Sequence, residues 1–129
     1  MTPVTEALHA CAGGILTAEA AVTLLADCGS WLHRDDFTSQ FITTADADGD
    51  GDGDGDGAIL MAAIDWQAAV TALDHGLLPC SSGERHVLKL AASIAAGTPV
   101  SLSDALTGID RRNASLVVKA VAHASALLS

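Results

Sequence analysis

Two short polar segments carry the residue types that could bind a charged partner. They are Ser81-Ser82-Gly83-Glu84-Arg85 and Asp110-Arg111-Arg112. Guanidinium groups bind carboxylate and phosphate through paired hydrogen bonds, and free N–H groups at a helix start attract anions. We therefore predict a binding site here for an anion or an acidic partner, and we assign no catalytic residue.

Arg111 and Arg112 follow Asp110, which we expect to begin a helix. Cations in the first turn are disfavoured by the helix dipole, so another group should compensate them. Solvent or an ion pair with Asp104, Asp110 or Glu84 is one interpretation. An anion held together with Arg85 is the other.

A run of alternating aspartate and glycine could bind a hard cation through its carboxylates. Its acidic residues are Asp46, Asp48, Asp50, Asp52, Asp54 and Asp56. D-x-D-x-D-G begins an EF-hand loop, but no twelve-residue register here ends on the required Glu. Our main interpretation is a self-repelling, disordered acidic loop over residues 46–57. Weak calcium binding is the alternative, and we expect no other cofactor.

His75, Cys80 and His86 could meet around a metal ion, but their spacings of five and six match no common zinc pattern. A Cys80–His86 pair of nucleophile and base is equally unsupported, because no oxyanion arrangement accompanies it. We therefore expect neither a metal centre nor a catalytic pair at these positions.

Local signals indicate three helices in the C-terminal half of the chain. Ser81 and Glu84 form a capping box, and Gly97 should close the helix that they begin. Ser101 or Ser103 should cap a short second helix. The third helix should run from Arg111 to about Leu127 as the central core helix.

The remaining elements follow from periodicity and capping residues. We expect one helix after Thr2-Pro3, a second over 18–27 capped by Thr17, a short turn over 31–33, and another helix after Asp65. Residues 39–44 and 58–64 should pair as strands. The predicted fold is mainly α: a compact bundle of about six helices with one small antiparallel β-hairpin carrying a flexible Asp-Gly loop, in a single domain over 1–129.

Composition limits the partners and the compartment. The 129 residues carry a net charge of −10, so nucleic-acid binding is not expected. No apolar run is as long as a membrane span, and no signal peptide is visible. The three cysteines are odd in number and widely spaced, which favours small core side chains in a reducing cytoplasm.

The segment Ser81-Ser82-Gly83-Glu84-Arg85 and the helix after it resemble the signature helix of ABC-type ATPases. Thr107-Gly108-Ile109-Asp110 is similar to the D-loop of that family. The resemblance implies that Ser82 and Gly83 contact a γ-phosphate across a dimer, and that Asp110 communicates between subunits. The sequence contains no G-x-x-x-x-G-K-[ST] phosphate loop, and Asp104-Ala105 stands where the family has its Asp-Glu pair.

About half of the chain resembles small uncharacterised cytoplasmic proteins of actinobacteria. The resemblance implies no activity. It rests on Ile64-Asp65-Trp66, Leu78-Pro79-Cys80-Ser81, Gly83-Glu84-Arg85, Leu90-Ala91-Ala92-Ser93, residues 104–110 and His123-Ala124-Ser125. We therefore predict a non-enzymatic protein–protein interaction or regulatory module of a bacterial cytoplasm, whose partner could be a second copy. Phosphate or nucleotide binding at the two polar segments and calcium binding by the Asp-Gly run remain alternatives.

Overall fold

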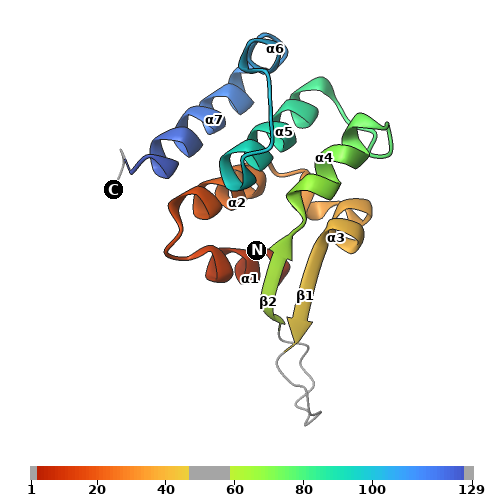
Figure 1. Cartoon of the computed structure of the whole chain (residues 1–129), viewed down its shortest axis with the longest axis vertical. Helices are drawn as coiled ribbons and strands as arrows, with labels where there is room; N and C mark the ends of the chain where they lie inside the picture. The colour runs from red at the N-terminus through yellow and green to blue at the C-terminus, as the bar shows by residue number, and fades with distance from the viewer. Residues whose placement is uncertain (1–2, 47–58, 127–129) are drawn as a thin grey trace.

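The computed structural model describes residues 3–46 and 59–126, and Figure 1 shows how their elements are arranged. Within these ranges the chain forms seven α-helices, one 3-10 helix and two strands. In order they are α1 (Pro3–Ala12), α2 (Leu16–Cys28), η1 (Trp31–His33), α3 (Asp35–Phe41), β1 (Ile42–Asp46), β2 (Ile59–Ile64), α4 (Trp66–Asp74), α5 (Ser82–Ala96), α6 (Leu102–Thr107) and α7 (Arg111–Ala124). The predicted fold class, mainly helical with one small antiparallel hairpin, is confirmed.

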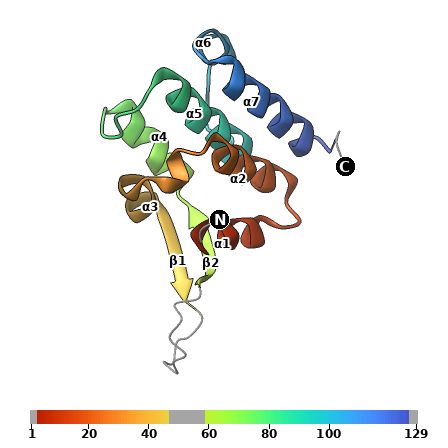
Figure 2. The ribbon, with the colours of Figure 1, turned by 180° about the vertical axis from the view of Figure 1, so that it is seen from behind.

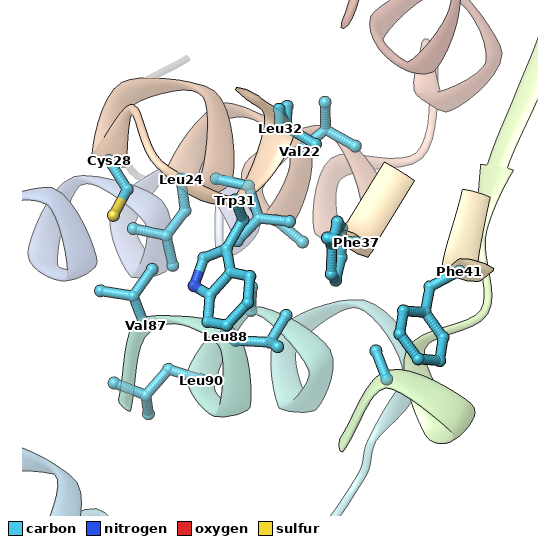
Figure 3. Close-up of a cluster of buried hydrophobic side chains, with 14 of the residues drawn as sticks. Val22, Leu24, Cys28, Trp31, Leu32, Phe37, Phe41, Val87, Leu88 and Leu90 are labelled. Atoms are coloured by element: carbon cyan, nitrogen blue, oxygen red, sulfur yellow. The ribbon is translucent and has the colours of Figure 1, made fainter. Parts of the chain in front are cut away.

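Helix α2 lies at the centre of the molecule and packs extensively against both α5 and α7. The core beside it holds Trp31 and Phe37, whose ring centroids are 5.4 Å apart, packed with Leu24 and Leu88 (Figure 3). The Trp31 ring also fixes the start of α5, because its Nε1 donates to the Glu84 carbonyl at 2.9 Å.

The expectation that α7 is the central helix is wrong. It buries Val117 and Ala120, but Val118 and Val121 face outward from it. Its apolar residues therefore lie on two sides, and only one side is packed. The apolar residues of α7 indicated that one side would be buried, but they did not indicate that α2 would lie at the centre of the molecule.

The first predicted strand began too early. Residues 39–41 belong to α3, and β1 begins at Ile42. Asp35 and Asp36 at the start of α3 suit the positive end of the helix dipole. The Ser39 hydroxyl then donates to the Asp35 carbonyl at 2.6 Å, one turn back. These local interactions prevail over the β-branched and aromatic composition of the segment.

The predicted boundaries of two other helices also need correction. Helix α2 begins at Leu16, ahead of Thr17, and Ile15 precedes it without a side-chain cap. Glu19 organises this start, because its Oε2 accepts a hydrogen bond from Gly14 N at 2.8 Å. Helix α7 ends at Ala124, before the expected end at residue 127. The predicted caps at Ser101 and Asp65 are confirmed.

The hairpin lies at one side of the molecule, with α1 beside β2, as Figures 1 and 2 show from opposite sides. Its two strands pair antiparallel from Ile42 opposite Ile64 to Asp46 opposite Ile59, with an irregularity next to Asp46. Helix α1 packs against β2 and supports it. Residues 47–57 of the predicted acidic loop lie outside the described part of the chain.

The three cysteines do not share one environment. None forms a disulfide: Cys28 is buried, Cys80 is half-buried and Cys11 is exposed. The expectation of a core position is therefore confirmed for Cys28 and wrong for Cys11. Of the helices that the structure describes, none has the length and apolarity to cross a membrane.

Candidate functional site

Ser81 and Glu84 begin α5 by bonding to each other's backbone. The Ser81 hydroxyl accepts a hydrogen bond from Glu84 N at 3.2 Å, and Glu84 Oε1 accepts one from Ser81 N at 2.9 Å. The backbone N–H of Ser81 is the main reason that the pKa of Glu84 lies below its usual range. The predicted capping box is confirmed, and both side chains are engaged in starting the helix.

Gly83 is the point where the start of α5 meets the start of α7. A Cβ atom here would lie 2.6 Å from Asp110 Oδ1 and 3.2 Å from Asn113 Nδ2. Asn113 holds the Asp110 carboxylate, with its N and Nδ2 donating at 3.2 and 2.7 Å. The backbone N–H of Asn113 is the main cause of the lowered pKa of Asp110. The structure thus brings the two predicted segments together at Gly83.

Three residues outside the predicted segments complete this cluster: His86, Gly108 and Asn113. The His86 ring packs against Gly108, because a Cβ there would lie 2.5 Å from His86 Nε2. Ser82 Oγ donates to the Gly108 carbonyl at 3.1 Å. Helical spacing could have indicated His86, which follows Ser82 by four residues on the same face. No sequence pattern indicated that Gly108 lies against Ser82 and His86.

The cluster contains a hydroxyl, an imidazole and a carboxylate, which are the groups that nucleophilic catalysis uses. Their hydrogen bonds have a different role here. The Ser82 hydroxyl donates to a backbone carbonyl, and both Asp110 oxygens accept from Asn113. Ser82 and Gly83, which the ABC-type resemblance places against a phosphate, face the α6–α7 junction of the same chain. The geometry therefore joins the starts of α5 and α7 to the end of α6.

The three arginines of the predicted site point to different neighbours. Arg112 Nη1 and Nη2 donate to the carbonyls of Cys28 and Asp27, at 3.3 and 2.8 Å, at the C-terminal end of α2. This negative end of α2 compensates the cation in the first turn of α7. Arg85 lies 3.6 Å from Asp74 at the end of α4. Arg111 is exposed. The structure does not gather these guanidinium groups around one point.

The predicted metal ligands fall mostly beyond the described residues. Asp46 ends β1, whereas Asp48, Asp50, Asp52, Asp54 and Asp56 lie outside the part of the chain that the structure describes. Over residues 3–46 and 59–126, no group of three or more His, Cys, Asp or Glu side chains is placed to hold a metal ion. Calcium binding by the Asp-Gly run stays a prediction.

Two surface cavities lie away from the cluster. One has a volume of about 220 Å³ and lies between α2 and α7. The other has a volume of about 170 Å³ and lies between α1, α2 and β2. The second is lined mainly by apolar side chains, including Leu8, Val22 and Trp66. The first is also lined by the charged side chains of Asp27 and Lys119, so it can pair with a charged ligand.

Comparisons with protein-family models, with curated proteins and with solved structures gave no match. The arguments about function therefore rest on the chain's own geometry. That geometry shows a polar cluster engaged in helix packing, and it also shows an uncovered surface on the last two helices.

Proposed function

We propose that this chain is a non-enzymatic protein–protein interaction module of a bacterial cytoplasm, and that it assembles with a second copy of itself through α7. One observation carries the proposal: the side of α7 that faces away from the core presents Val118 and Val121, 68% and 53% exposed. Their spacing of three residues places them on the same side of the helix. Leu102 and Leu106 are likewise exposed four residues apart on α6.

The rest of this side of α7 is small and uncharged over three turns. Helical periodicity places five residues beside Val118: Ala114, Ser115, Val121, Ala122 and Ser125. Small side chains let two helix backbones approach closely. Single exposed apolar residues are ordinary on protein surfaces, but two exposed valines within a stripe of small, uncharged residues indicate a contact surface.

A second copy fits this stripe in an antiparallel, two-fold arrangement. Val118 of one copy then lies against Val121 of the other, as a symmetric dimer interface requires. Arg111 lies at the N-terminal end of the same side. Antiparallel pairing in this register brings it about one turn beyond Ala124, so its long side chain can reach back toward the C-terminal carbonyls of the second α7, which carry partial negative charge. The arrangement would therefore stabilise a cation that its own helix dipole disfavours.

The polar cluster supports this function by holding α6 and α7 in position. Gly83 packs on Asp110, Ser82 bonds to Gly108, and Arg112 bonds to the end of α2. The segments 81–85 and 110–112 thus fix the elements that carry the surface. The three cysteines, none of which forms a disulfide, suit the reducing cytoplasm that we propose.

Sedimentation equilibrium over a range of protein concentrations tests the proposal. We expect the wild-type chain to dimerise, and the double variant Val118→Ser/Val121→Ser to stay monomeric. At a protein concentration low enough for the wild type to be monomeric as well, the two proteins should have the same melting temperature. Leu77→Ser is the matched control, because Leu77 is 67% exposed in the turn between α4 and α5. This control should dimerise like the wild type. A wild-type chain that is monomeric at every concentration, or a double variant that still dimerises, would contradict the proposal.

A further inference from the structure

The cavity between α2 and α7 combines an apolar floor with a charged rim. Its volume is about 220 Å³. The floor is made by Leu24, Leu116 and Ala120. Ala120 has a short side chain at the place where the two helices face each other, so the space beside it is left open. The remaining lining residues are Thr23, Asp27, Lys119 and His123.

One end of the cavity carries more positive than negative charge. Lys119 Nζ lies 4.0 Å from Asp27 Oδ2, at the limit of an ion pair, and the Lys119 side chain is 62% exposed. The Arg112 guanidinium lies at the same end, where it bonds to the Asp27 carbonyl. Two cations therefore lie near Asp27, with Lys119 at its carboxylate and Arg112 at its backbone carbonyl, and the exposed ammonium group of Lys119 can turn toward a ligand.

At the other end of the cavity, a histidine and a carboxylate are hydrogen-bonded to each other. His123 Nε2 lies 2.9 Å from Glu19 Oε1, and Glu19 Oε2 accepts from Gly14 N at 2.8 Å. The Glu19 carboxylate therefore has two hydrogen-bond partners, and one of them is the His123 imidazole. A ligand that reaches this end meets a closed pair of side chains, so its polar group belongs at Lys119.

We propose that this cavity binds a small monocarboxylic acid with a short aliphatic chain. Its carboxylate would pair with Lys119, and its hydrocarbon chain would cover Leu24, Leu116 and Ala120. Lys119 and His123 are four residues apart, which is about 6 Å along the helix axis. A chain of about four to six carbons spans that distance. The surrounding charges and the apolar floor together select an acid over an amine or an alcohol.

The site is independent of the proposed dimer. At 100° per residue, the lining residues of α7 lie on a different side of the helix from Val118 and Val121. A ligand in the cavity and a second copy on the stripe could therefore be present together. Failure of either proposal would leave the other standing.

Nuclear magnetic resonance titration of ¹⁵N-labelled protein tests the proposal, with hexanoate, hexanol and hexylamine as probes of equal chain length. We expect hexanoate to shift the backbone signals of residues 23–27 and 116–123 in a saturable manner, with millimolar affinity. Hexanol should bind more weakly, and hexylamine should bind the weakest of the three. The shifts should remain confined to these two segments.

Three variants make the test specific. Lys119→Met should weaken hexanoate binding about fivefold, which corresponds to the loss of one partly exposed charge pair. Lys89→Met is the matched control, because Lys89 pairs with Asp74 far from the cavity. This control should bind like the wild type. Thr23→Leu should fill the cavity from the α2 side and abolish binding.

Several results would overturn the proposal. One is the absence of saturable shifts with hexanoate, and another is shifts scattered over the surface or confined to the cavity beside β2. Equal weakening by Lys119→Met and Lys89→Met would also reject it, and so would tighter binding of hexylamine than of hexanoate. Because Lys119 is exposed, its replacement should not disturb folding, and the amide spectrum of each variant checks this directly.

Discussion

Replacing Gly83 by alanine should destabilise the fold, although alanine normally favours helices. The added Cβ would lie 2.6 Å from Asp110 Oδ1, too close for any real contact, so the carboxylate has to move. It then loses its bonds to Asn113 N and Nδ2. Asn113 is buried, so its amide group would be left without this partner.

The size of the effect follows from two costs and one gain in the free energy of unfolding. A lost helix cap costs about 1 kcal/mol. A buried amide left without a partner costs about 1 to 3 kcal/mol. The higher helix propensity of alanine returns up to about 1 kcal/mol. We expect Gly83→Ala to lower the free energy of unfolding by about 1 to 3 kcal/mol. For a chain of this length that corresponds to a fall in melting temperature of about 4 to 11 °C.

A double-mutant cycle assigns this effect to Asp110. In an Asp110→Ala background the closest obstructing atom is gone, and the next contact is Asn113 Nδ2 at 3.2 Å. Gly83→Ala should then be neutral or stabilising, as in an ordinary exposed helix. Chemical denaturation of all four proteins measures the cycle. A Gly83→Ala variant as stable as the wild type, or one equally destabilised in both backgrounds, would refute the reasoning.

The remaining predictions concern Arg112 and the acid side of the stability curve. Arg112→Met should lower the free energy of unfolding by about 1 kcal/mol, because two carbonyls at the end of α2 lose their donor. The neighbouring Arg111→Met should have no cost and serves as the control in the same denaturation experiment. The folded-state pKa values of Glu84 and Asp110 are lowered, so their contribution to stability is present above their unfolded-state pKa values and is lost as pH falls. Stability should therefore decline below about pH 4, and Asp110→Asn should flatten that decline in a pH series of melting curves.

Local interactions explain why much of the cluster could be predicted from sequence. The bonds of Ser81 with Glu84 and of Asp110 with Asn113 each span three residues, so they are encoded in a short segment. Helix starts of this kind can be identified without knowledge of the fold. For that reason the predicted ends of α5 and α6 and the predicted start of α7 are confirmed.

Contacts between distant segments could not be predicted in the same way. Arg112 bonds to residues 27 and 28, which lie 85 and 84 positions earlier, and Trp31 bonds to the Glu84 carbonyl 53 positions later. Nothing in the composition of either segment indicates its partner. The sequence did indicate that the cations at the start of α7 needed compensation. It did not indicate that the end of α2 provides it for Arg112.

Helix α7 is anchored at both ends and only partly packed in between. Arg112 bonds to the C-terminal end of α2, and His123 pairs with Glu19 near the N-terminal end of α2. Between these anchors, Val117 and Ala120 make the buried contact, and the small side chain at 120 leaves the cavity beside α2 open. Because the ends of α7 are fixed by polar contacts, the helix stays in place although its middle leaves a cavity against α2 and exposes Val118 and Val121 to solvent. A helix held in this way can lose the exposed valines without unfolding. For that reason the substitutions at Val118 and Val121 should change assembly while leaving the melting temperature of the monomer unchanged.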